Sequence, residues 1–308
     1  MVGTDVIDGR HRQSAPTVSV VVPVRNAPQR IAVCIEALLA QTYPQDHVQI
    51  VIVDNDSDDD TPDVVGSYPV IRVTESAAHS PYTARNAGIA AATGEIIALT
   101  DANCVPTKNW LANGVRALLD EGADLVGGKV TFTFSPRPTV GEFVDAVTNV
   151  DVEASIANHG ACMTGNLFVR RTVFSEIGLF SPSIRSGGDM RWTRCASDAG
   201  FRLVYAADAE VCYPARSLGP LLRKQIRVGR GVPGVWASFG MSRMQMTGMI
   251  VRGLLPMPPG RLAARVRERT AGTVPYGLAR LWLGVWLSKA VRSVGCVSGM
   301  LPRPLRED

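Results

Sequence analysis

Two oxygen-bearing side chains lie at and just after the end of a mostly apolar run, residues 95–101. Asp101 and Asn103, in LTDANCVP, stand two positions apart, so on an extended chain they share one face. Carboxylate and amide oxygens suit Mg²⁺ or Mn²⁺, which keeps further positions for water and substrate phosphates. Such an ion would neutralise a departing diphosphate. A turn stabilised by Asp and Asn is the alternative interpretation.

A second carboxylate, Asp189, follows two glycines in RSGGDMRW. The glycines allow the backbone to approach a ligand closely. We predict that Asp189 lies in the first turn of a helix over residues 189–199, where it would cap the helix and stabilise its dipole. It is equally suited to act as a general base that accepts the proton of an attacking hydroxyl. The sequence leaves both roles open.

Strands and helices that alternate along the first hundred residues must position these acids. Residues 18–24 and 48–54 are rich in β-branched side chains and nearly all apolar, as in strands buried on both faces of a parallel sheet. The apolar spacing predicts a helix over 29–41, an alanine-rich composition predicts another over 83–92, and 95–101 forms a further strand. This alternation predicts an α/β sheet with helices on both faces.

Ligands of such sheets bind beyond the carboxyl ends of the strands, where Asp54 and Asp101 lie. Neither strand is flanked by G-x-G-x-x-G or G-x-x-x-x-G-K-[ST], which disfavours a dinucleotide enzyme and a P-loop nucleotidase. Arg25 and Arg85 are candidate phosphate contacts, because guanidinium groups suit phosphate. Solvated surface arginines are the alternative.

The composition is that of a folded chain with 46% hydrophobic and 19% charged residues. The net charge of +4 is a mild excess, and we expect no nucleic-acid partner. The six cysteines include no C-x-x-C pair, so they predict ordinary thiols in a reducing compartment. The N-terminal residues contain no apolar run that could form a signal peptide, and we therefore expect a cytoplasmic active site.

Four segments in order, VSVVVPVRN, VIVDNDSDDDT, ARNAGIAAATGEIIALTDANCVP and GGDMRWTRCASDAGFRLVY, resemble the family 2 glycosyltransferases of the GT-A fold. The resemblance covers roughly residues 17–235. It implies a Rossmann-like, mostly parallel sheet with helices on both faces. It also implies inverting, metal-dependent transfer of a sugar from a nucleoside-diphosphate sugar to an acceptor hydroxyl, in glycan or glycolipid biosynthesis. The acceptor would be a glycan, a lipid-linked molecule or a small molecule.

The resemblance also implies roles for individual residues. Asp101 and Asn103 match the metal-binding motif, and Asp189 matches the acid that serves as general base. The positions that match nucleotide contacts are Pro23, Arg25, Asp54, Arg85 and Asp101. The candidates for contacts with the acceptor or the diphosphate are Gly188, Arg191, Trp192, Arg227 and Arg230.

Several departures from the family pattern matter. Asn103 stands where an aspartate is usual and lacks its charge, and Gly188 stands where a glutamate is common. The stretch RKQIRVGRG lacks the tryptophan of processive synthases, so we expect one sugar per encounter. A non-catalytic nucleotide-sugar-binding homologue stays open as an alternative. A sugar nucleotidyltransferase is disfavoured because PVRNAPQR, after the first strand, contains no glycine.

We predict a flexible segment at 1–16, a GT-A domain at 17–235 and a helical, basic and apolar region at 236–308. In the apolar run 278–300, Lys289 and Arg292 argue against a membrane span, because each costs about 2.5–3.5 kcal/mol at a helix centre. One interpretation is an interfacial helix with tryptophans at headgroup level, which would place the enzyme on the inner face of the membrane. The other is a helix packed on the catalytic domain.

Overall fold

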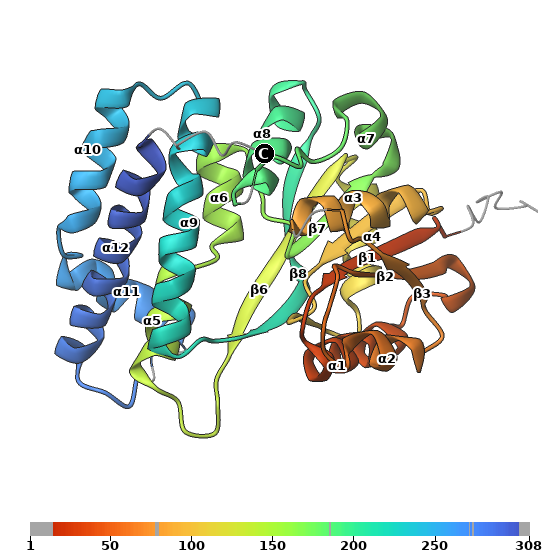
Figure 1. The fold of residues 1–308 in the computed structure, drawn as a ribbon, viewed down its shortest axis with the longest axis horizontal. Coiled ribbons are helices and arrows are strands. Elements are labelled where there is room, and N and C mark those ends of the chain that lie inside the picture. Colours follow the sequence, from red (N-terminus) through yellow and green to blue (C-terminus); the bar gives the residue numbers. More distant parts are fainter. Residues whose placement is uncertain (1–14, 78–79, 185, 271, 273, 302–308) are drawn as a thin grey trace, which may run out of the picture.

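The computed structural model describes residues 15–77, 80–184, 186–270, 272 and 274–301. These residues form one eight-stranded sheet with helices on both faces and a further group of helices beside it (Figure 1). Across the sheet the strands are β3 (Ile71–Thr74), β2 (Val48–Asp54), β1 (Val18–Val24), β4 (Ile96–Thr100), β7 (Asn166–Arg170), β6 (Leu125–Thr133), β8 (Leu203–Pro214) and β5 (Val105–Pro106). The predicted flexible segment 1–16 lies outside the described residues, apart from its last two.

The sheet is mostly parallel, as predicted. β1 pairs in parallel with β2 and β4, β2 with β3, and β6 with β8, whereas β7 runs antiparallel to both β4 and β6 and β5 runs antiparallel to β8. Sequence analysis assigns no strand to residues 166–170. This antiparallel strand joins the first half of the sheet to the second, and the loop before it therefore lies beside the carboxyl end of β4.

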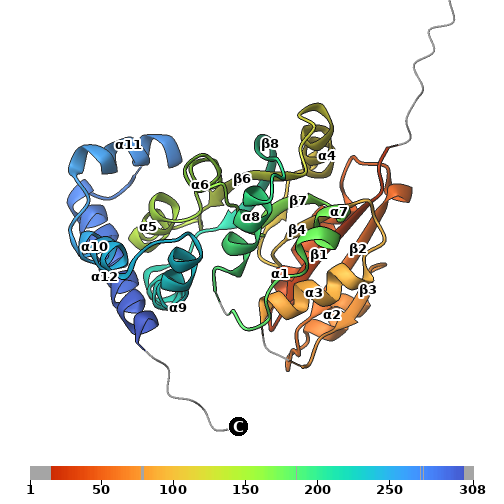
Figure 2. The ribbon, with the colours of Figure 1, turned by 90° about the horizontal axis from the view of Figure 1, so that it is seen from above.

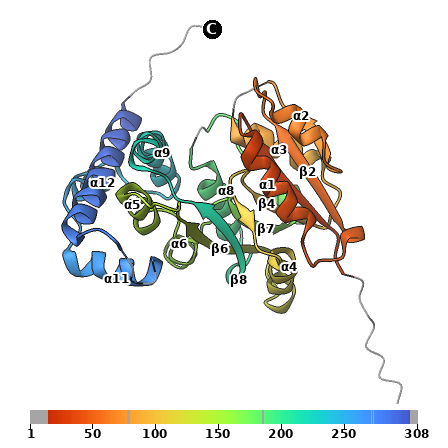
Figure 3. The same cartoon turned by 90° about the horizontal axis from the view of Figure 1, so that it is seen from below.

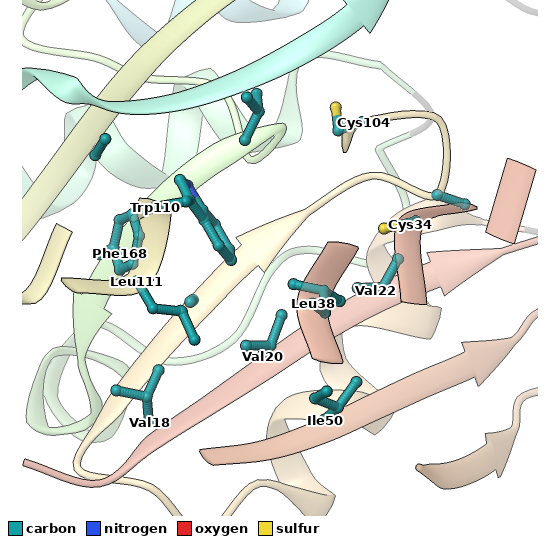
Figure 4. Close-up of a cluster of buried hydrophobic side chains, with 14 of the residues drawn as sticks. Val18, Val20, Val22, Cys34, Leu38, Ile50, Cys104, Trp110, Leu111 and Phe168 are labelled. Atoms are coloured by element: carbon teal, nitrogen blue, oxygen red, sulfur yellow. The ribbon is translucent and has the colours of Figure 1, made fainter. Parts of the chain in front are cut away.

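The helices of the sheet region are α1 (Pro28–Leu39), α2 (Thr61–Gly66), α3 (Pro81–Ala91), α4 (Trp110–Asp120), α5 (Val140–Thr148), α6 (Val152–His159), α7 (Arg171–Ile177) and α8 (Gly188–Asp198), with one 3₁₀ turn at Gln45–His47. Two apolar clusters fill the two faces of the sheet. In one of them Trp110 packs on Phe168 with ring centroids 4.9 Å apart (Figure 4). A Cβ at Gly114 would lie 2.2 Å from the Phe168 ring, so only glycine allows α4 to pack this closely.

Helix α9 (Leu218–Ser238) is followed by the C-terminal region, which is helical, as predicted, and contains α10 (Arg243–Leu254), α11 (Pro259–Arg269) and α12 (Leu278–Met300). α9 lies between the sheet and α12 (Figure 2 and Figure 3). The two helices approach closely through glycines: a Cβ at Gly229 would lie 2.3 Å from the Arg292 carbonyl, and one at Gly295 would lie 2.6 Å from the Ile226 carbonyl.

The domain boundary between residues 235 and 236 falls near the end of α9 and stays a prediction. The helix predicted at 278–300 has the bounds of α12. Within the described part of the chain, the helices are all too short or too polar to cross a membrane.

Candidate active site

A cleft of about 1370 Å³ lies between the carboxyl ends of the parallel strands and helix α9. Pro23 and Arg25 reach it from the end of β1, and Asn55 from the end of β2. Among the site residues predicted from the sequence, those that line the cleft are Pro23, Arg25, Arg85, Asp101, Asn103, Asp189 and Arg227. The structure thus brings the residues matched to the metal motif and the general base into one cavity.

Asp101 directly follows β4 at the edge of the cleft. Its Oδ1 accepts a hydrogen bond of 2.5 Å from Nη2 of Arg85, whose side chain is only 7% exposed. A Cβ at Gly165 would lie 3.5 Å from Oδ2, so no side chain from that position covers this oxygen. Within the described residues Oδ2 accepts no hydrogen bond, and it remains available to a ligand from the cleft.

Asp189 lies in the first turn of α8, as predicted. The N-cap is Gly187, whose φ of 81° favours glycine. Asp189 Oδ1 accepts a hydrogen bond of 3.1 Å from the Tyr82 hydroxyl and one of 3.0 Å from its neighbour's backbone N–H. From the described residues Oδ2 accepts only a long contact of 3.4 Å, from the Thr164 N–H. One carboxylate oxygen is therefore fixed, and the other is weakly held.

The Tyr82 hydroxyl also accepts a hydrogen bond of 2.8 Å from the Gly188 N–H, and the ring lies against Gly188. Burial raises the pKa of Tyr82, and the Asp189 carboxylate raises it further. The phenol therefore stays protonated at neutral pH and donates to Asp189. Gly188 does not line the cleft, but it allows Tyr82 to reach the acid.

Tyr82 and Arg85 are three residues apart on α3 and so lie on one face of the helix. Tyr82 holds Asp189 and Arg85 holds Asp101, and the guanidinium of Arg85 lies 5.7 Å from the Tyr82 ring centroid. One helical turn thus braces both acids. Arg85 is predicted from the sequence as a nucleotide contact and Tyr82 is not, although the spacing of three residues between them in PYTARNAG places both on one helix face.

Cations line the opposite wall of the cleft. The Arg216 guanidinium lies 3.4 Å from the buried carboxylate of Asp145, and Lys224 Nζ lies 3.9 Å from it. Burial lowers the pKa of Lys224 to about 8; Arg216 also lowers it, and Asp145 opposes the shift. Arg227 also lines the cleft and pairs with no described carboxylate. Sequence analysis selects only Arg227 from this wall, which can hold a diphosphate.

The remaining candidates do not line the cleft. Asp54 is buried, accepts a hydrogen bond from the Ser57 N–H and lies 3.7 Å from Arg72. Trp192 is a core residue that stacks on Phe174 and donates to the Gly178 carbonyl. Arg191 and Arg230 are exposed outside the cleft on α8 and α9.

The model of the family "Glycosyl transferase family 2" matches residues 19–177. The chain belongs to this family. Glycosyltransferase AglE from Haloferax volcanii is 37% identical over 93% of this chain and 97% of its own length. The pre-mycofactocin glycosyltransferase of Mycobacterium tuberculosis is 25% identical over 65% of this chain, but the match spans only 43% of that relative.

Two solved structures share the fold. The mannosyltransferase PcManGT from Pyrobaculum calidifontis, in complex with GDP-Man and Mn²⁺, has a TM-score of 0.64 and 20% identity, covering 94% of this chain and 89% of that one. TarS residues 1–349 from S. aureus, in complex with UDP, has a TM-score of 0.52 and 16% identity, covering 92% and 90%. The predicted family, fold and enzyme class are thereby confirmed: the protein is a GT-A glycosyltransferase.

Proposed function

We propose that this glycosyltransferase moves one sugar per encounter from a nucleoside-diphosphate sugar to an acceptor hydroxyl, with inversion at the anomeric carbon. The observation that carries the proposal is the shared bracing of Asp101 and Asp189, which line one cleft and are held by residues of a single turn of α3. In this proposal Asp101 serves the donor phosphates and Asp189 serves the acceptor hydroxyl.

The residues at the end of β4 fit a divalent cation that takes most of its ligands from a diphosphate and water. Asp101 Oδ2 accepts no hydrogen bond from described residues, and the half-buried Asn103 lies two positions further on, also lining the cleft. Within the described part of the chain no three His, Cys, Asp or Glu side chains form a metal-binding group. Two oxygen ligands suit Mg²⁺ or Mn²⁺, which often binds through one or two carboxylates and substrate phosphates. When bound, the ion would neutralise the diphosphate leaving group.

Asp189 acts as the general base. Its weakly held Oδ2 accepts the proton of the acceptor hydroxyl while Tyr82 fixes Oδ1. The acceptor oxygen forms a bond to the anomeric carbon on the face opposite the diphosphate, and the bond between that carbon and the diphosphate oxygen breaks. Attack from the opposite face inverts the configuration. Arg216, Lys224 and Arg227 hold the departing diphosphate.

The proposal is tested with Asp189→Asn in a transfer assay with GDP-, UDP- and dTDP-sugars and Mn²⁺. We expect kcat to fall by about 10²- to 10⁴-fold, while the Kd for the nucleoside diphosphate stays unchanged, because general-base catalysis is lost and the donor site remains intact. The matched control is Asp198→Asn, an exposed acid at the other end of α8, which should keep full activity.

Asp101→Asn should instead weaken the dependence of donor binding on Mn²⁺, which a titration of the ion at fixed nucleotide concentration measures. Full activity in both the Asp101 and Asp189 variants would refute the mechanism. Nucleotide binding without turnover of any donor by the unmodified protein would favour the non-catalytic alternative.

A further inference from the structure

The net positive charge of the chain comes from its C-terminal region. Residues 236–308 contain eleven basic and three acidic residues, so residues 1–235, with twenty-one basic and twenty-five acidic residues, are net negative. Arg265 and Arg269 pair with Asp151 of the sheet region. Arg243, Arg252, Arg261, Arg267 and Arg280 are exposed, and none forms an ion pair with a described carboxylate.

The same region exposes most of the large apolar side chains. Of the 17 that are exposed among the described residues, 12 lie between residues 244 and 301. Those on α12 are Leu283, Trp286, Leu287, Val294 and Val297, and Leu301 follows at its end. At 3.6 residues per turn these positions fall within about 60° of one line along the helix. They form a continuous apolar stripe, whereas Leu281 and Val285 point into the core.

Helix α10 carries a similar stripe of Met244, Val251 and Leu255, all more than half exposed. The two helices are joined where Trp286 Nε1 donates a hydrogen bond of 2.7 Å to the Leu254 carbonyl. Lys289 Nζ donates to the next carbonyl, that of Leu255. These bonds hold the end of α10 against α12. We call the two stripes together the docking face.

Helices α10 and α12, which carry the docking face, lie at the end of the molecule away from β3 (Figure 1). Arg280 precedes Leu283 by one turn on α12, and Arg243 and Arg252 lie beside the stripe on α10. An apolar stripe flanked by arginines is typical of helices that lie in the surface of an anionic bilayer. A partner protein surface would have to match both the apolar stripes and this excess of unpaired arginines.

We propose that the docking face binds the surface of an anionic lipid bilayer, with the apolar stripes in the headgroup and acyl boundary and the arginines on lipid phosphates. The proposal does not depend on the transfer mechanism above, because it rests on residues outside the cleft. It refines the interfacial helix expected from the sequence. Trp286 is 37% exposed, whereas Trp282 is half-buried and donates to the Met257 carbonyl.

The first experiment is flotation of the full chain with vesicles of phosphatidylcholine containing about one third phosphatidylglycerol, compared with phosphatidylcholine alone. We expect binding to the anionic vesicles that weakens at high salt. The triple variant Leu283→Gln, Val294→Gln, Val297→Gln should lower the partition coefficient about tenfold or more, because it removes apolar area from the docking face.

The matched control is the triple variant Val33→Gln, Leu119→Gln, Leu179→Gln. These three side chains are each 48% exposed, compared with 50–62% for the docking-face set, but they lie in the sheet region. The control should bind vesicles like the unmodified chain. Equal loss of binding in both triple variants would overturn the proposal, and so would unmodified protein that fails to float with anionic vesicles.

A second measurement does not depend on the folding of a triple variant. Brominated phosphatidylglycerol should quench part of the tryptophan fluorescence of the unmodified protein, and Trp286→Phe should remove most of that quenching. Trp110 and Trp192 are buried and should not respond. Quenching that is unchanged in Trp286→Phe would contradict the proposal. A stable dimer that the docking-face triple variant dissociates would identify a second copy as the occupant and would also overturn it.

Discussion

The sheet region and the C-terminal helices bury and expose different kinds of side chain. In residues 1–235 two extensive apolar clusters cover the faces of the sheet, and the net charge is negative. The helices after residue 238 share two smaller clusters with α5 and α9, are strongly basic and expose most of the large apolar side chains. The sheet region thus contains the larger core and both acids, α9 contributes cations to the cleft, and the helices beyond α9 present an exposed basic and apolar surface.

The largest expected difference between the two regions is the loss of stability when a large side chain is removed. Trp110→Ala should lower the free energy of unfolding by about 3–5 kcal/mol, because it removes a fully buried ring and leaves Asn166 Oδ1 without its 2.8 Å donor. Denaturant unfolding followed by circular dichroism measures it. Leu283→Ala, in the docking face, should cost about 1 kcal/mol or less, because this side chain is already 54% exposed. Equal losses would show that the two regions contribute alike to stability.

A smaller effect should arise where α9 meets α12. Gly295→Ala places a Cβ about 2.6 Å from the Ile226 carbonyl, which is backbone and cannot rotate away. We expect a loss of about 1–3 kcal/mol in the free energy of unfolding, with faster proteolysis of the C-terminal helices than of the sheet region. Gly248→Ala is the control: a Cβ there meets nothing within 4 Å, so the variant should gain up to about 1 kcal/mol. Stabilisation of both variants would rule out tight packing.

The smallest effect, per pH unit, is a pH dependence at Lys224, where α9 reaches the cleft. The pKa of Lys224 is lowered from 10.5 to about 8, so the unfolded chain holds this proton at higher pH than the folded one. Between about pH 8 and 10.5 this group should therefore raise the free energy of unfolding with pH, by at most about 1.4 kcal/mol per pH unit. The difference between the unmodified chain and Lys224→Gln isolates the effect. A difference that does not change over this range would contradict it.

The sequence predicted the parallel part of the sheet because buried strands there are continuous apolar runs, such as residues 18–24 and 48–54. It did not predict β7, because NLFVR is short and begins with Asn166, a fully buried amide. Asn166 is satisfied by partners far along the chain, among them Trp110 and the carbonyls of Lys129 and Ala209. Contacts between residues so far apart along the chain produce no local sequence pattern from which the strand could be predicted.

The site shows the same limit. Asp101 and Asp189 were found because their loops follow a strand and open a helix, and local spacing reveals such positions. Tyr82 was missed because its importance comes from Asp189, which is 107 residues away. In α12 the bounds were predicted, but the outward side was not. Apolar side chains surround this helix, and only packing decides that Leu281 is buried and Leu283 exposed.

Arg85 and Tyr82 hold Asp101 and Asp189 in place from α3. The spacing of the two acids can therefore stay constant while the side chains at the rim of the cleft change. Neither brace belongs to the cleft-lining positions of α9 and α10, such as Val228 and Met249, so the side chains there can vary while the spacing of the acids is kept. New donors or acceptors can then be explored by remodelling the cleft rim. A directed-evolution library for altered sugar transfer should accordingly randomise the rim and keep α3 fixed.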